Sequence, residues 1–373
     1  MIFINLQKRQ AMNKLYALIM AATTIIAPAN AAESINMIVG TYTGNGSKGI
    51  YSYRFDLQSG KAVQLSELET PNPSFVTLSP DGMEIYAVDE SNKETDSAVS
   101  IDYNPESGEM RIINNQPTNG KAPCYIATNG RIAVTANYNG GSLSVFPINT
   151  DGSLAPMSQQ FKYELTGSAP DTIRQKSAHV HCTIFTPDGT SLLATDLGND
   201  RIYRFAIEND TLRQTAAYDL PAGSGPRHLT FSPDGRFAYL ITELSGEVMA
   251  FELKGNQLRH IQTATCDKAG GRGSADIHVS PDGQFLYASN RTKNDGIAIL
   301  RIDKHTGKLE ETGYQPTGVH PRNFAITPDG RYLLCACRDS NKISVYKTGA
   351  DGQLTDTGND IDLPSPVCVI FHK

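Results

Sequence analysis

The sequence predicts an all-β protein: a seven-bladed β-propeller whose blades are four-stranded antiparallel sheets. Three observations lead to this prediction. A Pro-Asp-Gly turn recurs along the chain at a spacing close to 47 residues, short strand-forming runs fill each interval, and the two ends of the chain each hold part of one further unit. A repeat of this length with four short strands is typical of a propeller blade.

The turns are five copies of one element, Ser/Thr-Pro-Asp-Gly, and Asn129-Gly130 is a shortened sixth copy. The steps between the glycines that end these turns are 48, 59, 46, 48 and 47 residues. The long step indicates an insertion, which we place at residues 167–177. Asp-Gly favours the positive φ of a tight hairpin, so each turn is expected to join the first two strands of a blade. The five full copies occupy residues 79–82, 186–189, 232–235, 280–283 and 327–330.

Within each unit, runs rich in β-branched and aromatic residues alternate with turn residues, which is the pattern of short strands. In the fourth unit, for example, the expected strands are residues 228–231, 236–241, 247–252 and 257–261.

The two ends of the chain supply complementary strands of a seventh unit. The N-terminal part begins with a second strand at residues 36–41 and a third at 49–56. Residues 366–371 resemble residues 73–78, an inner strand, but no partner strand follows them. We therefore expect the last strand to pair with the first and to close the ring, which removes an open sheet edge.

Composition limits the classes of function. The 373 residues are 39% hydrophobic and 19% charged, with a net charge of −6, which is typical of a soluble globular chain. A mildly acidic chain without basic stripes is not expected to bind nucleic acid. The six cysteines do not match metal or redox spacings and are expected to be small buried residues. No metal or cofactor is predicted, and a monomer is expected.

Residues 1–31 have the pattern of a signal peptide. Lys14 supplies positive charge, residues 15–28 are apolar, and Ala29-Asn30-Ala31 is an A-x-A cleavage site. Met12 opens a more conventional signal, so the residues before it are interpreted as a misassigned start. The apolar stretch is too short for a membrane span, and no later segment qualifies. We expect an exported chain, periplasmic or secreted, with residues 32–373 forming one propeller domain.

Propeller topology predicts where the chemistry is located. The starts of the inner strands and the ends of the second strands lie on one face around the channel mouth, where binding residues are expected. Imidazole and guanidinium groups gather on one arc of this mouth and predict a local trap for an anion. The inner-strand starts carry His179, His181, Arg227, His228, Asp276, His320, Arg322 and Asn323, and the second-strand ends carry Asp196, Glu243, Asn290, Arg291, Arg338 and Asp339. The same positions in the other units hold Ser74, Asp89, Glu90, Cys124, Asn137, Tyr138, Val367 and Tyr42.

Each of these groups has two interpretations. His179 and His181 are two apart on a strand and face one side, either as a structural pair or as a water-activating base or ligand contact. A metal site would need a third ligand from Asp196 or Glu243, which nothing in the spacing demands. Arg227 and Arg322 either hold loops through backbone carbonyls or capture a carboxylate or phosphate. Glu243 is either their ion-pair partner or a group that positions water or carries a proton.

Several motifs, in order along nearly the whole mature chain, resemble the signatures of the bacterial propeller lactonases, the 6-phosphogluconolactonase family. Fungal carboxymuconate cycloisomerase is a more distant relative. The motifs occupy residues 179–189, 194–203, 225–231, 243–245, 275–283, 287–291 and 321–324.

The resemblance implies hydrolysis of 6-phosphoglucono-1,5-lactone without a metal, in a cleft built from a His, two Arg and a Glu. By motif match these fall on His179 or His181, Arg227, Glu243 and Arg291. The remaining polar residues expected to bind the substrate, a small anionic sugar lactone, are His228, His320, Arg322, Asn323, Asp196, Asn137 and Tyr138.

Two departures from the family pattern affect the expected substrate. Thr292-Lys-Asn-Asp follows Arg291 where the family more often continues Gly-His-Asp. The signal peptide points away from a cytoplasmic sugar phosphate, so an unphosphorylated aldonolactone is also expected. Two other functions stay open: a non-catalytic exported propeller that binds a glycan or protein, and a muconate-type cycloisomerase.

Overall fold

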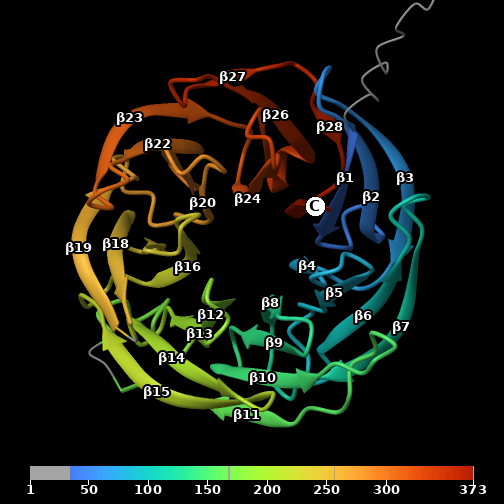
Figure 1. Ribbon diagram of the computed structural model, residues 1–373, viewed down its shortest axis with the longest axis vertical. Coiled ribbons are helices and arrows are strands. Elements are labelled where there is room, and N and C mark those ends of the chain that lie inside the picture. Colours follow the sequence, from blue (N-terminus) through green and yellow to red (C-terminus); the bar gives the residue numbers. More distant parts are fainter. Residues whose placement is uncertain (1–33, 167–168, 256, 373) are drawn as a thin grey trace, which may run out of the picture. The chain divides into compact units, whose positions relative to one another are not determined.

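The computed structural model describes residues 34–166, 169–255 and 257–372. The expected signal peptide therefore lies outside the described residues. From Ser34 onward the chain forms seven antiparallel sheets arranged in a ring (Figure 1). This arrangement confirms the predicted all-β, seven-bladed propeller. Among the described residues, none belongs to a helix that is long and apolar enough to cross a membrane.

We number the blades from one to seven in chain order, and each begins with the strand nearest the centre of the ring. Blade one contains β4 (Val76–Leu78), β5 (Glu84–Val88), β6 (Ser97–Tyr103) and β7 (Met110–Pro117); blade two contains β8 (Pro123–Thr128), β9 (Ile132–Asn137), β10 (Ser142–Pro147) and β11 (Gln159–Lys162). Blade three contains β12 (Val180–Phe185), β13 (Ser191–Asp196), β14 (Arg201–Glu208) and β15 (Thr211–Asp219); blade four contains β16 (Pro226–Phe231), β17 (Phe237–Thr242), β18 (Glu247–Lys254) and β19 (Gln257–Thr265).

The last three blades continue this order. Blade five contains β20 (Ile277–Val279), β21 (Phe285–Asn290), β22 (Gly296–Ile302) and β23 (Leu309–Pro316). Blade six contains β24 (Pro321–Ile326), β25 (Tyr332–Cys337), the 3₁₀ turn η2 (Arg338–Ser340), β26 (Lys342–Thr348), β27 (Leu354–Asp356) and β28 (Ile361–Asp362). Blade seven contains β29 (Pro366–Phe371), β1 (Ser34–Thr41), β2 (Gly49–Asp56) and β3 (Lys61–Glu69).

The recurring Pro-Asp-Gly turn is held by its own side chains. In blade one the Ser79 hydroxyl donates to the Asp81 carboxylate at 2.7 Å and accepts the amide of Glu84 at 2.9 Å. Gly82 adopts φ +76°, which a residue without Cβ reaches at little cost. The side chains of the motif thus form hydrogen bonds that stabilise the turn. This explains why the same residue types recur in every full copy.

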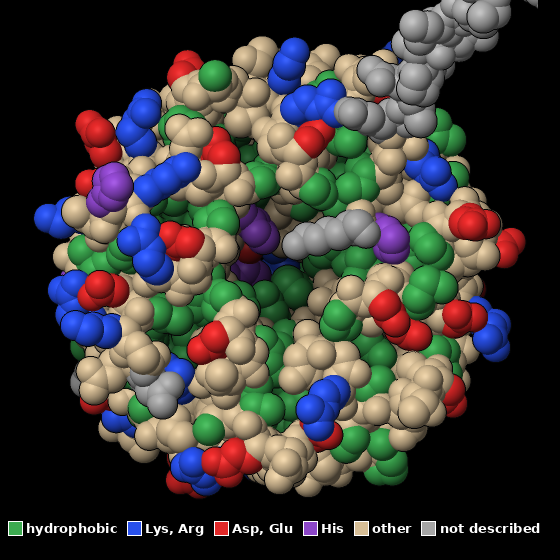
Figure 2. Space-filling model, in the orientation of Figure 1, with side chains coloured by type: hydrophobic (Ala, Val, Ile, Leu, Met, Phe, Trp, Pro, Cys, Tyr) green, Lys and Arg blue, Asp and Glu red, His purple; other side chains and the backbone are tan. Residues whose placement is uncertain are grey.

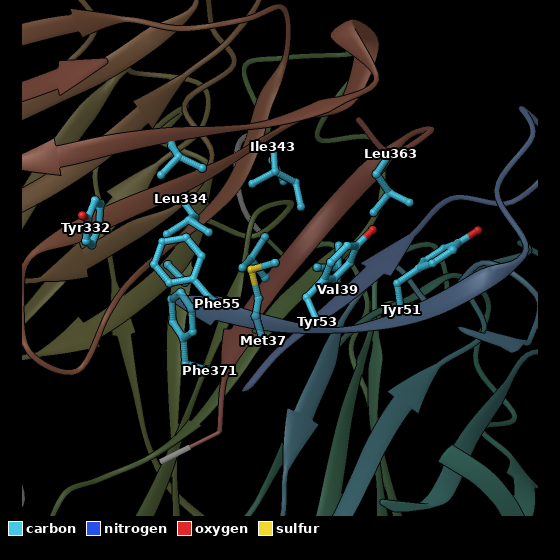
Figure 3. Packing of buried hydrophobic residues seen from close by; sticks show 14 residues of the cluster. Met37, Val39, Tyr51, Tyr53, Phe55, Tyr332, Leu334, Ile343, Leu363 and Phe371 are labelled. Carbon is cyan, nitrogen blue, oxygen red and sulfur yellow. The ribbon is translucent and has the colours of Figure 1, made fainter. Parts of the chain in front are cut away.

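The ring closes between the two ends of the chain, as predicted. β29 pairs antiparallel with β1, with Val369 opposite Val39. Side chains of this closing blade pack against blade six in one hydrophobic cluster, in which Phe371 and Met37 lie near Leu334 (Figure 3). Burial of this cluster stabilises the closure, because apolar surface from three distant parts of the sequence leaves water together.

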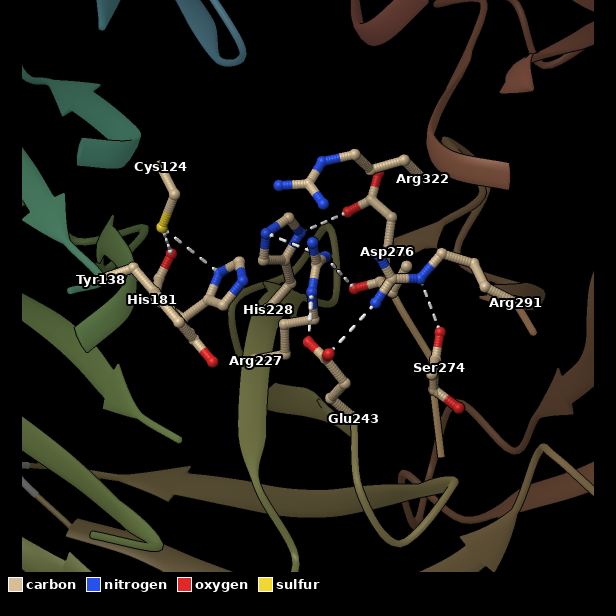
Figure 4. A network of polar contacts seen from close by, with 12 residues as sticks. Cys124, Tyr138, His181, Arg227, His228, Glu243, Ser274, Asp276, Arg291 and Arg322 are labelled. Carbon is tan, nitrogen blue, oxygen red and sulfur yellow. Dashed lines mark hydrogen bonds and ion pairs between the residues drawn. The ribbon is translucent and has the colours of Figure 1, made fainter. Parts of the chain in front are cut away.

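Several inner strands carry a β-bulge directly after their first residue. The register between β8 and β9 skips Cys124, the β12 and β13 register skips His181, and the β24 and β25 register skips Arg322. In β16 the shift spans Arg227 and His228. A bulge re-aims the side chain of the extra residue. The equivalent position of the repeat thus supplies the groups that gather in Figure 4.

All six cysteines are free and buried, as predicted. Cys124, Cys182 and Cys368 lie on the inner strands β8, β12 and β29. Cys335 and Cys337 lie on β25 without forming a disulfide.

Candidate active site

Three guanidinium groups converge on one buried carboxylate. Arg174 Nη2 lies 2.6 Å from Glu243 Oε1, Arg227 Nε lies 2.9 Å from Oε2, and Arg291 Nη2 lies 3.3 Å from Oε1. Figure 4 shows Arg227, Arg291 and Glu243 in this network. Burial alone raises the pKa of Glu243, but Arg291, Arg227 and Arg174 outweigh it and lower the pKa to about 2. The carboxylate therefore stays ionised at neutral pH.

Backbone carbonyls hold two of these arginines in place. Arg227 Nη1 donates to the carbonyl oxygen of Ala275 at 2.7 Å, and Arg291 Nε donates to that of Gly273 at 2.7 Å. Burial lowers the pKa of Arg291 to about 9, which leaves the guanidinium charged at neutral pH. Among the described residues, none accepts a hydrogen bond from Arg227 Nη2. The Arg227 side chain is buried, so only a group inside the site can reach this nitrogen.

Arg174 was not predicted as a site residue. It lies in the insertion between blades two and three, and its Nη2 also contacts the Tyr138 hydroxyl at 3.4 Å. Within the same insertion, Asp171 accepts the amide of Arg174 at 2.9 Å and pairs with Arg272 at 2.5 Å. The sequence signal was the long step between turns, because an insertion that breaks a repeat marks an added loop.

His228 forms a close pair with Asp276. Its Nδ1 lies 2.7 Å from Asp276 Oδ1, and its Nε2 lies 3.3 Å from Arg227 Nη1. Burial, reinforced by Arg227, lowers the pKa of His228 to about 4 although Asp276 opposes the shift. His228 is therefore neutral at neutral pH, with Nδ1 as the donor and Nε2 as the acceptor.

His179 and His181 contact the same tyrosine in different ways. The His179 ring stacks on Tyr138 at 4.3 Å, with Nδ1 2.9 Å from the Tyr138 carbonyl oxygen and Nε2 3.2 Å from the Ser177 hydroxyl. The His181 ring lies edge-on to Tyr138 at 5.4 Å and to His228 at 5.2 Å. Both nitrogens of His179 are thus occupied, whereas His181 faces the network.

Blade six contributes a further cationic group, Arg322. Arg322 Nη2 is 3.7 Å from Glu90 Oε2, and its guanidinium lies 5.2 Å from the centre of the Tyr42 ring. The Tyr42 hydroxyl donates to the same Glu90 oxygen at 2.7 Å. His320 approaches Arg291, with Nε2 3.2 Å from Nη1. Burial and the neighbouring Arg291 lower the pKa of His320 to about 3.

Three residues expected to bind substrate are buried and bonded to protein groups instead. Asp196 accepts the amides of His179, Gly198 and Asn199. Asn137 donates to the hydroxyls of Ser142 and Ser144, both at 3.0 Å. The side chain of Asn323 donates to Asp276 at 2.5 Å and accepts the amide of Val369 at 2.6 Å. These hydrogen bonds hold all three side chains in place within the protein.

The cluster has an excess of positive charge. Arg174, Arg227, Arg291 and Arg322 supply four cations, whereas Glu243 and Glu90 supply two carboxylates. The carboxylate of Asp276 is shared with His228 and His278. Buried, incompletely compensated guanidinium groups attract an anion or a developing negative charge.

Comparison with known proteins agrees with this architecture. A family model described as a seven-bladed β-propeller lactonase matches residues 36–371. A 6-phosphogluconolactonase of Formosa agariphila is 38% identical over 349 residues, which cover 89% of this chain and 96% of the relative. A solved candidate 6-phosphogluconolactonase of Bacteroides uniformis is 53% identical, with a TM-score of 0.89 over 91% of this chain and 99% of that chain. The periplasmic gluconolactonase of Pseudomonas aeruginosa is 35% identical, with a TM-score of 0.85 over 91% of this chain and 99% of that chain.

Proposed function

Because the chain belongs to the seven-bladed β-propeller lactonase family, we propose that it hydrolyses a small anionic sugar-acid lactone at the cluster around Glu243. The observation that carries the proposal is the convergence of Arg174, Arg227 and Arg291 on one ionised carboxylate beside neutral histidines. If a lactone carbonyl lies among these groups, the guanidinium groups stabilise the negative charge that forms on its oxygen.

Hydrolysis is an acyl transfer to water, and negative charge grows on the carbonyl oxygen as water attacks. A donor aimed at that oxygen lowers the barrier more than one that binds the ground state. Arg227 is suited to this role, because its Nη1 is held by the Ala275 carbonyl, its Nε faces Glu243, and no described residue accepts a hydrogen bond from its Nη2. Arg291, held by Gly273, is the second donor of the site.

Glu243 organises the cluster rather than transferring a proton. A carboxyl group whose pKa is lowered to about 2 is a poor base at neutral pH. Its two oxygens have about four acceptor positions; Arg174 donates a hydrogen bond to one of them, and Arg227 and Arg291 lie within ion-pair distance. A remaining acceptor position can hold the attacking water, while a neutral histidine at the site, His181 or His228, takes the proton.

Arg322 is proposed to bind the anionic end of the substrate. It lies apart from the Glu243 network, its contact with Glu90 is long, and Tyr42 supports its guanidinium plane. Guanidinium groups bind carboxylate and phosphate through the same planar fork, so a phosphorylated lactone and an aldonolactone with another anionic group share this chemistry.

We also propose that the mature protein is exported and acts as a monomer. The apolar run before Ala29-Asn30-Ala31 supports export, and a relative that is 35% identical is named a periplasmic gluconolactonase. Sequencing of the mature N-terminus after cell fractionation tests export, with a start near Ala32 in the periplasmic or secreted fraction expected. Light scattering measures the mass in solution.

The test of the function is lactone hydrolysis above the spontaneous background, for 6-phosphogluconolactone and a series of aldonolactones. We expect Arg227→Ala to lower the rate roughly 10²- to 10³-fold, the usual effect of losing an oxyanion donor. Arg236→Ala, on an exposed turn of the same blade, is the matched control and should keep the wild-type rate. No excess rate with any lactone would contradict the proposal and favour a binding propeller, and turnover of a muconate alone would favour the cycloisomerase.

A further inference from the structure

The geometry points to His228 as the catalytic base, with Asp276 and His278 as positioning residues that hold it in a His-Asp-His series. This inference deepens the proposed hydrolysis and rests on it. The series is continuous: Asp276 Oδ1 lies 2.7 Å from His228 Nδ1, and Asp276 Oδ2 lies 2.9 Å from His278 Nε2. One carboxylate therefore bridges two imidazoles.

The first contact fixes the tautomer of His228. An ionised Asp276 accepts the Nδ1 proton, so the lone pair of the neutral ring is on Nε2. That nitrogen lies 3.3 Å from Nη1 of Arg227, the arginine proposed to stabilise the oxyanion. A water bound at Nε2 is thus next to Arg227, which would stabilise the oxyanion that forms when this water attacks the lactone carbonyl. The contact is longer than a strong hydrogen bond, so water can replace it.

Asp276 is itself held firmly. Besides the two histidines, its Oδ2 accepts the side-chain amide of Asn323 at 2.5 Å and the backbone amide of Phe324 at 3.1 Å. Burial alone raises the pKa of Asp276, but His278 and His228 outweigh it and hold the pKa far below its ordinary value. The carboxylate remains ionised and cannot rotate without losing several hydrogen bonds, which is the property an orienting group requires.

His228 is surrounded by charged groups and by aromatic rings. Arg227 of its own strand and Asp276 before β20 are the charged groups in contact with it, and His278 lies beyond Asp276. His181 of β12 and Tyr125 of β8 face its ring edge-on at 5.2 and 5.1 Å. Phe75, which precedes β4, stacks on Tyr125 and also meets the His228 ring edge-on. These rings restrict the orientation of the imidazole, and Figure 4 shows His228 between His181 and Asp276.

His179 and His181 are less suited to the role. Both nitrogens of His179 have protein partners, Tyr138 and Ser177. His181 Nδ1 faces the Cys124 thiol at 3.7 Å, and a thiol does not fix a tautomer as a carboxylate does. Of these three histidines, His228 is the one bonded to the buried carboxylate of Asp276.

His278, the outer member of the His-Asp-His series, reaches solvent. The His278 side chain is 40% exposed, whereas that of His228 is 6% exposed. Partial burial lowers the pKa of His278, but Asp276 outweighs it and the pKa lies above the ordinary value. The space-filling view shows a hollow at the centre of the ring with histidine side chains inside it (Figure 2). His278 therefore lies on the solvent side of Asp276 and is positively charged below its raised pKa.

In the proposed reaction His228 first accepts a proton and later gives it up. His228 takes one proton from water as the oxygen–carbon bond forms at the carbonyl. The bond between that carbon and the ring oxygen then breaks, and the leaving alkoxide takes the proton from His228. The new carboxylic acid ionises, so each turnover consumes one water and releases one carboxylate and one proton.

The deciding experiment compares the acid limb of the pH–rate profile in two variants. The wild-type rate should fall as the pH drops through about 4, because protonation of His228 removes the base. Asp276→Asn removes the group that raises this pKa, so its limb should move to lower pH, with a roughly 10-fold or greater loss of kcat. His278→Gln removes a positive charge and keeps a donor, so its limb should move to higher pH, by about one unit. A purely structural role would not produce opposite displacements.

His228→Gln should lose roughly 10²- to 10⁴-fold in kcat, the usual contribution of a general base. His305→Gln, an exposed histidine of the turn after β22, is the matched control and should leave the profile unchanged. An acid limb that stays in place in both Asp276→Asn and His278→Gln, or moves the same way in both, would overturn the inference.

A second measurement does not depend on turnover. NMR titration of the imidazole signals should show a raised pKa for His278 that returns toward the ordinary value in Asp276→Asn, and a lowered pKa for His228. If the pKa of His278 is the same in Asp276→Asn as in wild type, the proposed His-Asp-His series is contradicted, even if no lactone substrate is found. Conversely, a wild-type protein without lactone turnover but with these titrations contradicts only the proposed function.

Discussion

Arg174 Nη2 donates to Glu243 Oε1 at 2.6 Å, although the two residues are 69 positions apart in the sequence. The arginine comes from the insertion before blade three, and the carboxylate follows the second strand of blade four. The insertion thus adds a third guanidinium group to a carboxylate that already pairs with Arg227 and Arg291.

Arg174→Ala is expected to lower kcat/KM roughly 10-fold, because a partly exposed ion pair contributes less than a buried one. Arg174→Lys should restore only part of the activity, since an ammonium group lacks the planar fork. Steady-state kinetics measure both effects. Lys176→Ala, an exposed residue of the same insertion, is the control. Equal losses in Arg174→Ala and Lys176→Ala would show that the loop acts only through its shape.

Glu243→Gln should destabilise the fold at neutral pH by about 3 kcal/mol, because it leaves three guanidinium groups without their shared carboxylate. Denaturant unfolding measures the change. The exposed carboxylate of Glu208, which pairs with Arg213, provides the control: Glu208→Gln should change stability by less than about 1 kcal/mol.

The same pair of proteins tests the pKa of Glu243. A carboxyl group whose folded pKa is lowered to about 2 stabilises the fold above its unfolded pKa, and this contribution is lost as the pH falls toward 2. The stability difference between wild type and Glu243→Gln should therefore shrink between about pH 4.5 and about pH 2. A difference that is independent of pH over this range would contradict the assigned ionisation.

Asn137→Ala should reduce stability by about 1–3 kcal/mol and leave KM nearly unchanged, because its amide is buried and bonded to Ser142 and Ser144. Unfolding and kinetics on the same preparation separate the two effects. Asn139→Ala, an exposed neighbour, controls for local disturbance. A large rise in KM with unchanged stability would instead support direct binding of substrate by Asn137.

Val369→Ala should cost about 2 kcal/mol of folding stability, since Val369 is buried in the cluster that closes the ring. Val63→Ala makes the same chemical change on β3 of the same blade, where the side chain is 68% exposed, and should cost little. Thermal or denaturant unfolding compares them. Equal effects would mean that the closing strand contributes no more than an outer strand.

The repeat itself predicted most of the fold. Ser79, Asp81 and Gly82 form a turn from their own hydroxyl, carboxylate and positive φ, so the motif determines the hairpin wherever it occurs. The closure between residues 366–371 and 36–41 was also predictable, because a complete ring needs every inner strand to find a partner. These features depend on local chemistry and on repeat counting.

The site was only partly predictable. Position in the repeat indicated that Arg227, Glu243 and Arg291 lie on one face, and the structure brings them into contact. It could not separate these from Asp196 and Asn137, whose polar atoms are bonded to nearby protein groups. A repeat gives the place of a side chain along the strand but not its hydrogen-bond partners.

The seven units, their turns, the closing strand and the arc of cationic residues follow from the order of the amino acids. The contact of Arg174 with Glu243 and the link that Asp276 makes between His228 and His278 become visible in the folded ring alone. The difference is one of range, because turns and strand patterns follow from contacts within a few residues. The ionisation and orientation of buried groups depend instead on desolvation and on partners from other blades, which come together only in the folded ring.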